Sequence, residues 1–541
     1  MAIQPSGETW TYAHDPNSGE LASITGPDAD LSFAYDGDLL LSETWDWGGA
    51  VPETTVTRTY DDFLQLDTLQ VNANTPIGFA YDDDGLLTAA GAMSVTRRAD
   101  NGLIATSTLG VVEDTWTFSP FAELEHYTVT VAETPIFDVG YERDKLGRIT
   151  TKTEMIEGVT TVYEYAYDPA GRLWKVWEDS VLVSTYEYDV NGNRLKHITT
   201  AGETVGVYDD QDRLLSYGTT TYTYRENGEL KTATEGSETT HYDYDARGNL
   251  RSVTLPDSTL IEYLIDGRDR RVGRKVNGVV EKRWVYKDQL NPVAELDAAG
   301  NVVAEFVYGA KSNVPDYLIR DGATCRIVSD HLGSVRLVID SDSQMIRERT
   351  NYGEFGAVLG SSTISTASLQ PFAYAGGLSD LDTGSILFGA RNYYAGVTRW
   401  GSRDPIVFGG RQSNLFEYAA GDPVNVVDTS GESPTLAAQL VTAAGAFCVA
   451  VEAVRTVNGV LDPLRYTELL ATLERLNRKL LDRLNDPNCP ADKKLEFERL
   501  RKEIERLRIQ VLNDVPYSSN PPFDAAMAGI CAAIIYGGGF L

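Results

Sequence analysis

Two aspartates near residue 400 have the type and spacing for acid–base catalysis. Asp404 lies in the segment SRDP and Asp428 in the segment VDTSG, and Arg403 precedes the first aspartate. Two carboxyl groups that share a proton can hydrolyse a peptide, because one ionises and activates water while the other donates its proton. An adjacent arginine would lower one pKa, although such a pair titrates as a unit. Asp404, Asp428 and Arg403 are therefore the candidate catalytic residues.

A structural interpretation of the same aspartates stays open. Both precede turn-forming residues, and an aspartate at the start of a turn accepts hydrogen bonds from backbone amides further along the chain. In this interpretation Asp404 and Asp428 fix turns that end strands and catalyse nothing.

The remaining residues predict no cofactor and no metal site. The lone His331, in DHLG, is more typical of a structural turn than of a catalytic base. Asp82, Asp83 and Asp84 lack the alternating spacing and the distal glutamate of a calcium loop, which favours a solvated turn. No nucleotide-binding glycine loop appears. The four cysteines form no CxxC pair and lie far apart, at Cys325, Cys448, Cys489 and Cys531.

Repeated hairpins must position these residues. One phrase recurs about every 20 residues, as AYDPAGRL (166–173), EYDVNGNRL (187–195), VYDDQDRL (207–214), TYRENGEL (223–230) and DYDARGNL (243–250). An alternating run ends in Tyr-Asp, a turn follows, and a leucine restarts the apolar face at Leu173, Leu195, Leu230 and Leu250. Degenerate copies extend upstream. One hairpin is marginal in water, so the hairpins must pair edge to edge in one sheet, and the fold class is mainly β.

Composition and charge agree with a long antiparallel sheet. The 541 residues include 29 Tyr and 48 Gly, which suit strands and tight turns. Residues 432–541 carry 13 Lys and Arg and 14 Asp and Glu, so 34 of the 47 basic and 65 of the 79 acidic side chains lie in residues 1–431. Such an acidic sheet repels phosphates, so no nucleic-acid binding is expected of it.

The phrase Y-D-x-x-G-R-L resembles the YD or RHS repeat family, which includes Rhs polymorphic toxins, Tc-toxin C components and teneurins. A further segment is similar to the RHS-repeat-associated core. It comprises DHLGSVRLVID (330–340), YGEFG (352–356), GARNYYAGVTRWGSRDPI (389–406) and NLFEYAAGDPVNVVDTSG (414–431). The resemblance implies three parts: a repeat shell (1–310), the core (311–431) and a variable C-terminal region (432–541).

What the resemblance implies is a β-strand shell that spirals around a hollow interior and is closed at one end by the core. The C-terminal region would be an effector held inside as cargo. Asp404 and Asp428 would form an aspartic peptidase that cuts its own chain near Gly431. This sequence departs from the usual D-P-x-G motifs, since the first copy reads DPIVFG and the second reads DTSG followed by Glu432.

The C-terminal region changes period. Leucines recur at helical spacing in 462–484 and 491–512, with NDPNCP between them, which predicts a charged helical hairpin. Two uncharged stretches, 433–451 and 525–541, approach the length that crosses a membrane. Buried helices are the favoured interpretation, and membrane insertion after release is the alternative. Residues 432–541 contain no histidine, which disfavours a histidine-dependent nuclease.

The sequence is compatible with three functions. The first is a toxin-like shell that encapsulates its own C-terminal region and releases it, with secretion machinery and an immunity protein as partners. The second is a structural or adhesive cell-surface shell that binds glycans or cells, and the third is an inert remnant. The N-terminus shows no signal peptide. Location is therefore expected to be secreted or cell-surface by a non-classical route, or cytoplasmic before export.

Overall fold

One continuous antiparallel sheet dominates the computed structural model, which describes residues 2–3, 9–363, 368–410 and 412–436. The sheet has 35 strands. Each strand pairs with its neighbours in the chain, as β15–β16, β16–β17 and β17–β18 illustrate. The prediction of a mainly β shell built from hairpins is confirmed. The predicted boundary at residue 310 falls inside this sheet, and the predicted helices of the C-terminal region lie outside the described residues.

The strands of this sheet are β1 (Ala2–Ile3), β2 (Thr9–His14), β3 (Leu21–Thr25), β4 (Asp30–Asp36), β5 (Leu39–Asp46), β6 (Thr54–Tyr60), β7 (Leu66–Val71), β8 (Ile77–Tyr81), β9 (Leu87–Ala90), β10 (Met93–Arg97), β11 (Ile104–Leu109), β12 (Val112–Phe118), β13 (Leu124–Val131), β14 (Thr134–Arg143), β15 (Ile149–Ile156), β16 (Val159–Tyr167), β17 (Leu173–Glu178), β18 (Val181–Tyr188), β19 (Arg194–Thr199), β20 (Gly202–Tyr208), β21 (Leu214–Tyr217), β22 (Thr220–Tyr224), β23 (Leu230–Glu235), β24 (Glu238–Tyr244), β25 (Leu250–Thr254), β26 (Leu260–Ile265), β27 (Arg271–Val276), β28 (Val279–Tyr286), β29 (Pro292–Leu296), β30 (Val302–Val307), β31 (Tyr317–Arg320), β32 (Ala323–Ser329), β33 (Val335–Asp340), β34 (Ile346–Tyr352) and β35 (Val358–Thr363).

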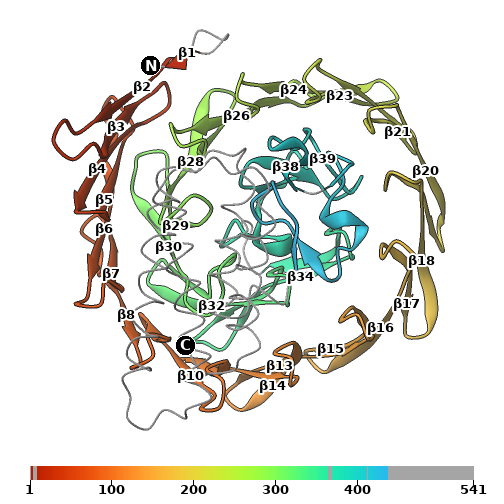
Figure 1. Ribbon diagram of the computed structural model, residues 1–541, viewed down its shortest axis with the longest axis horizontal. Helices are drawn as coiled ribbons and strands as arrows, with labels where there is room; N and C mark the ends of the chain where they lie inside the picture. Colours follow the sequence, from red (N-terminus) through yellow and green to blue (C-terminus); the bar gives the residue numbers. More distant parts are fainter. Residues whose placement is uncertain (1, 4–8, 364–367, 411, 437–541) are drawn as a thin grey trace, which may run out of the picture.

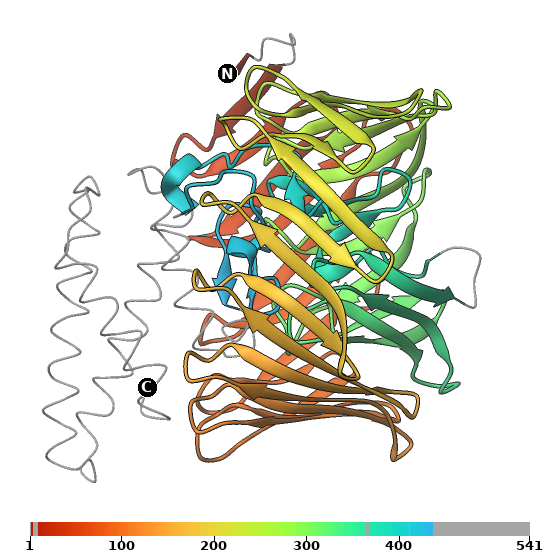
Figure 2. The ribbon, with the colours of Figure 1, turned by 90° about the vertical axis from the view of Figure 1, so that its right-hand side faces the viewer.

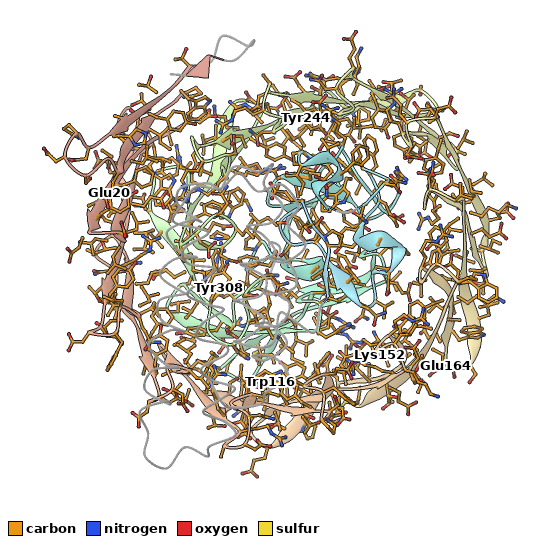
Figure 3. The ribbon with its side chains drawn as sticks, in the orientation of Figure 1. Glu20, Trp116, Lys152, Glu164, Tyr244 and Tyr308 are labelled. Atoms are coloured by element: carbon orange, nitrogen blue, oxygen red, sulfur yellow. The ribbon has the colours of Figure 1, made fainter. Side chains whose placement is uncertain are left out.

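The sheet is rolled into a spiral (Figure 1). Strands β2–β26 run once around a central space, and β28–β34 continue the sheet inside this first turn. Alternating burial marks the inward face of strands in the outer turn, as in β12, where every second residue is buried, whereas β33 of the inner turn is buried along its whole length. Figure 3 shows the same two faces, with Trp116 and Lys152 on the inner side of the wall and Glu164 on the outer side.

The overlapping turns of the spiral share one hydrophobic core. Trp45 of the outer turn belongs to the same buried cluster as Trp284 and Phe306 of the inner turn. Buried ion pairs join the two turns as well: Arg270 to Glu43 (2.5 Å), Arg326 to Asp114 (2.8 Å) and Arg336 to Glu154 (2.6 Å). In each pair the carboxylate lies on the outer turn, and the arginine lies in the inner turn or, for Arg270, just before it, so the pairs connect the two turns.

The Tyr-Asp phrase forms the turn at one rim of the shell. In the repeat at 166–173, Tyr167 pairs with Leu173 across the hairpin. Asp168 Oδ1 accepts hydrogen bonds from the amides of Ala170 and Arg172, at 2.9 and 3.0 Å. Gly171 has a φ of +91°, which the turn requires and which glycine adopts without strain.

The tyrosine of the phrase connects one hairpin to the preceding one. Tyr188 donates from its hydroxyl to the carbonyl of Leu173 at 2.8 Å. Its ring also lies 4.7 Å from the guanidinium carbon of Arg172. The same hydroxyl–carbonyl bond recurs along the shell at Tyr60, Tyr81, Tyr167, Tyr208, Tyr286 and Tyr308, with lengths between 2.6 and 3.0 Å.

The prediction that Leu195 lies on the inward, apolar face is wrong. The repeat at 187–195 is one residue longer before its leucine, so Arg194 takes the place that Leu173 takes in the repeat before it. Arg194 is buried, and its guanidinium carbon lies 4.9 Å from the centre of the Tyr217 ring. Leu195 is 37% exposed on the outer face, because consecutive strand residues point to opposite sides.

Removing one of these tyrosine hydroxyls tests the connection between hairpins. We expect Tyr188→Phe to lower the free energy of unfolding by about 1 kcal/mol, the usual net contribution of a hydrogen bond. Tyr163→Phe is the matched control, because the Tyr163 hydroxyl makes no hydrogen bond to another described residue. Urea denaturation followed by fluorescence measures both, and an equal effect of the two variants would contradict the role of the Tyr188 bond.

An inner domain, defined here as the described residues of 368–436, lies within the spiral (Figure 2). It contains η1 (Tyr374–Gly376), β36 (Leu378–Asp380), β37 (Ser385–Phe388), β38 (Arg391–Tyr394), β39 (Arg399–Trp400), η2 (Val407–Gly410), η3 (Ala419–Gly421), β40 (Val426–Val427) and β41 (Thr435–Leu436). Its core is mostly aromatic and includes Tyr374, Tyr393, Trp400 and Tyr418.

The inner domain is attached to the rim that carries the Tyr-Asp turns. Asn425 Oδ1 accepts the amide of Ile149 at 2.8 Å, and Arg399 donates to Asn193 Oδ1 at 3.0 Å. His331 bridges the two parts, since its Nε2 donates to the carbonyl of Val424 (2.8 Å) and its Nδ1 accepts from the hydroxyl of Tyr141 (3.1 Å). The inner domain is therefore anchored to the wall at this end of the spiral.

Candidate active site

Three segments of the inner domain bring the candidate residues together. Asp404 follows β39 and Asp428 follows β40, while Arg391 begins β38 immediately after the tight turn at Gly389. All three side chains are buried. Strand ends and turns of one small domain thus place two carboxylates and one guanidinium in the same interior position.

Arg391 joins the two carboxylates. Its Nη2 lies 3.0 Å from Asp404 Oδ2 and 3.2 Å from Asp428 Oδ2. The guanidinium also packs on Trp400, with its carbon 4.1 Å from the ring centre. Because one arginine faces two acids, the group carries one excess negative charge when both carboxyls are ionised.

Burial explains most of where a proton binds. The pKa of Asp404 is raised to about 6, because burial and, to a smaller extent, the nearby Asp428 and Glu432 raise it more than Arg391 and the amide of Ile406 lower it. A proton on Asp404 makes the three-residue group neutral, which a buried site favours. Asp404 can therefore carry a proton near pH 6, as the acid of an acid–base pair must.

The same residues hold the peptide bond between Gly431 and Glu432. Arg391 donates from Nε to the carbonyl oxygen of Gly431. Asp428 Oδ1 accepts the amide of Glu432 at 3.1 Å. Ser430 Oγ accepts the same amide at 3.1 Å and donates to Asp428 Oδ1 at 3.1 Å. Both ends of one peptide bond are therefore in contact with the arginine–carboxylate group.

Gly431 is fixed against the turn that carries Arg391. Its φ is +69°, and a Cβ at this position would lie 2.3 Å from the carbonyl oxygen of Phe388. Ala390 donates from its amide to the carbonyl of Ser430 at 2.9 Å. Only glycine fits so close an approach, so the bond after it is held in one position.

These groups are the ones that hydrolysis of this peptide bond would use. Arg391 would polarise the Gly431 carbonyl and stabilise negative charge on its oxygen during attack. One carboxyl would take a proton from an attacking water, and the protonated carboxyl would supply one to the nitrogen of Glu432 as the carbon–nitrogen bond breaks. The products would be a carboxyl group on Gly431 and an amino group on Glu432.

Arg403 does not reach the two aspartates. Its side chain is exposed, and a Cβ at Gly228 in the wall would lie 3.6 Å from Arg403 Cδ. The prediction that Arg403 adjusts the pair through its sequence position is corrected by this placement. Arg403 is exposed whereas the next residue, Asp404, is buried, so the two side chains point to different sides.

Sequence reasoning missed Arg391. The segment GARNYY contained it, but nothing in the spacing to Asp404 distinguished it from other arginines nearby. The partial signal was Gly389 two residues before it, since a glycine turn followed by a strand places the first side chain of that strand, here Arg391, beside the turn.

The other residues considered from the sequence have structural contacts. Asp82 Oδ1 accepts the amides of Asp84 and Leu86, at 3.0 and 2.9 Å, so this segment is a turn. Burial lowers the pKa of His331, which suits the neutral ring that bridges wall and inner domain. Within the described ranges, no cluster of three or more His, Cys, Asp or Glu side chains is arranged to hold a metal ion. No helix in the part described here is long and apolar enough to cross a membrane.

Comparison with protein-family models matches residues 3–424 to the family "Teneurin YD-shell". Among curated proteins, Teneurin-3 of Mus musculus is 26% identical over 359 residues, which cover 64% of this chain and 13% of that protein. The tRNA3(Ser)-specific nuclease WapA of Bacillus spizizenii is 26% identical over 275 residues, covering 49% of this chain and 12% of that protein. The chain thus spans about an eighth of the length of these relatives.

Among solved structures, the Tc holotoxin pore of Photorhabdus luminescens has a TM-score of 0.66 and 18% identity. The match covers 80% of this chain and 25% of that chain, which carries an aspartate-to-alanine substitution in its TccC3 component. At this level of identity the likeness concerns the fold, which is the same spiral β-shell.

Proposed function

The chain belongs to the teneurin YD-shell family, and from this premise we propose that it is a shell that encapsulates its own C-terminal region and releases it by cutting the bond between Gly431 and Glu432. The cargo is residues 432–541. The peptidase is the group formed by Asp404, Asp428 and Arg391, acting on its own chain.

One observation carries this proposal: the arginine–carboxylate group is already in contact with both ends of that peptide bond. Arg391 Nε donates to the Gly431 carbonyl, and Asp428 Oδ1 accepts the Glu432 amide at 3.1 Å. If the two aspartates only fixed turns, Arg391 would not need to pair with both of them. It would also not need to donate a hydrogen bond to the Gly431 carbonyl. Holding the reacting bond against the catalytic groups raises their effective concentration, and this supplies a large part of an enzyme's rate enhancement.

The partners and the location follow from the same proposal. Secretion machinery would deliver the shell, and an immunity protein would neutralise the released region in the producing cell. The location is then secreted or cell-surface by a non-classical route, or cytoplasmic before export. WapA is by name a nuclease, but residues 432–541 of this chain contain no histidine, so we propose a different activity for them, with insertion into a membrane as the first to test.

Intact-mass measurement of the freshly translated full chain tests the proposal. We expect two products, one ending at Gly431 and one beginning at Glu432. Their formation should be first order, with a rate that does not change on tenfold dilution, because the site acts on its own chain. An uncut chain, or a rate that falls with dilution, would contradict self-cleavage.

A structural shell without catalysis is the second candidate. The observation in its favour is that Asp428 Oδ1 accepts the amides of both Glu432 and Ser433, each at 3.1 Å, as an aspartate that fixes a turn does. In this case the full chain stays intact, and a glycan-array or cell-binding assay of that intact chain should give a signal.

The pH dependence of cleavage follows from Asp404. Its pKa in the folded chain is about 6, above the ordinary value of 3.8, so the proton stays bound as the pH rises from 4 to 6 and is lost above 6. We expect the cleavage rate to fall about tenfold for each pH unit above 6, since the proton donor is lost. To measure the cleavage rate against pH, the chain is made by cell-free translation and transferred into buffers from pH 6 to pH 8. A rate that rises with pH would contradict a protonated Asp404.

A further inference from the structure

The chain on both sides of the bond after Gly431 is held by the inner domain. Beyond this bond, β41 pairs antiparallel with β40, and Thr435 lies opposite Val427. Ser433 donates from its amide to Asp428 Oδ1 at 3.1 Å. Both contacts belong to residues that follow the bond, so hydrolysis of the bond breaks neither of them.

The strand that pairs with β41 is fixed in the core of the inner domain. Val427 of β40 is fully buried and belongs to the aromatic cluster that contains Tyr374 and Tyr393. Among the described strands, β40 pairs with β41 alone. If β41 left, β40 would become an edge strand with unpaired backbone groups. The inner domain therefore keeps a place for one short strand after the cut.

Hydrolysis of the bond creates two charges, and each of them already faces a group of opposite charge. Water adds across the bond, the acid formed on Gly431 ionises, and the amine formed on Glu432 takes up a proton at neutral pH. Arg391 donates from Nε to the Gly431 carbonyl oxygen, so the new carboxylate meets a guanidinium. Asp428 Oδ1 accepts the Glu432 amide at 3.1 Å, so the new ammonium meets a carboxylate.

Departure of the new ammonium would leave an excess of negative charge in the site. Arg391 would then face at least two ionised carboxylates, Asp428 and the new carboxylate of Gly431, whether or not Asp404 carries a proton. The side chains of Arg391 and Asp428 are each 1% exposed, so water does little to screen that excess. A buried charge without a partner is strongly unfavourable, and this holds the ammonium in place.

We propose that residues 432–436 stay docked on the inner domain after the cut, with the new ammonium of Glu432 against Asp428 and β41 on β40. This inference rests on the proposed cut after Gly431, and it divides release into two steps, cutting and undocking. The docking place recognises a strand by its backbone and by a free amino terminus. An amino terminus displaced by one residue loses the contact with Asp428.

The experiment begins with the full chain and separates the cut from the docking. Mass under denaturing conditions shows whether the bond after Gly431 is cut, and an uncut chain contradicts the proposed function. The same 541 residues are then co-expressed as two polypeptides, 1–431 and 432–541, which gives the cut state without self-cleavage. The second polypeptide follows a removable tag whose protease leaves Glu432 as the first residue. Two polypeptides that do not co-purify would overturn the docking.

Acetylation of the Glu432 amino group by N-acetoxysuccinimide at pH 7 measures the docking in both preparations. A free α-amino group has a pKa of about 8 and reacts through its neutral fraction, whereas a docked ammonium is protected. The matched control carries one added glycine before Glu432 in the second polypeptide, which moves the amino group away from Asp428 and leaves the shell unaltered. We expect the amino group of Glu432 to react at least tenfold more slowly than that of the added glycine, because its contact with Asp428 is charge-assisted.

A second variant tests the carboxylate that holds the amino group. In the two-polypeptide preparation, Asp428→Asn should raise the acetylation rate at Glu432 at least tenfold. Asp422→Asn is its control, since Asp422 is bonded to Asn425 instead, and it should leave the rate unchanged. Equal rates with and without the added glycine would overturn the docking, even if the two polypeptides stay together. Equal rates in Asp428→Asn and Asp422→Asn would overturn it as well.

Discussion

Asp428→Asn is expected to leave the chain as one polypeptide of 59.4 kDa, where the unaltered chain divides after Gly431. Asparagine keeps the size of the side chain and an oxygen for Arg391, but it neither ionises nor carries a transferable proton. Acid–base groups contribute about 10²-fold to 10⁴-fold to rate, so the cut product should fall by at least about a hundredfold. Intact mass after a fixed incubation measures the uncut fraction.

The matched control for this substitution is Asp422→Asn. Asp422 is a buried aspartate of the same inner domain, and burial raises its pKa to about 6 as well. Its carboxylate accepts hydrogen bonds from Asn425 Nδ2 at 2.8 and 3.0 Å, and it is not one of the two carboxylates that pair with Arg391. We expect Asp422→Asn to cut at the unaltered rate. Cutting by Asp428→Asn at the same rate as this control would show that the pair only fixes a turn.

Asp404→Asn should give the same uncut chain as Asp428→Asn. The two carboxylates share one arginine, so removing either leaves no pair to exchange a proton. The double variant should be no worse than the single ones, because residues that act as a unit are not additive. Partial cleavage in one single variant would identify the carboxyl that is dispensable.

The repeating part of the fold was predictable because its signals are local. Tyr-Asp, a glycine and a leucine lie within eight residues, and one hairpin satisfies all of them. The packing of the inner turn on the outer turn was not predictable in this way. Glu43 and Arg270 are 227 positions apart, and no period in the sequence relates them. How far the spiral turns before it overlaps depends on the summed twist of many strands.

The site was predictable only as far as its aspartates. Motif order identified Asp404 and Asp428, and the structure places both on one guanidinium. The arginine itself was misassigned, because closeness in sequence was taken for closeness in space. The side chain of Arg403 is exposed, whereas Arg391 enters from a separate hairpin whose turn also contacts Ser430 and Gly431. Contacts between hairpins depend on tertiary packing, which local patterns do not contain.

Arg326 is expected to be the residue whose loss most weakens the joining of the two spiral turns. It lies in β32 and is fully buried with Asp114 of β12 and Asp316, at 2.8 and 3.2 Å. Arg326→Ala removes the only described cation paired with these two carboxylates. Breaking a buried pair in this way costs about 3–5 kcal/mol, because the acids stay behind without a counter-charge. Urea denaturation should therefore show a much lower unfolding midpoint.

An exposed pair provides the control for Arg326. Arg98 and Asp100 are 2.9 Å apart, with side chains 38% and 61% exposed, so Arg98→Ala should leave the midpoint unchanged. A further variant that combines Arg326→Leu with Asp114→Asn and Asp316→Asn removes the charges together and should recover much of the loss. If Arg326→Ala alone behaves like Arg98→Ala, the buried pairs do not hold the turns together. The shared core around Trp45, Trp284 and Phe306 would then do so without them.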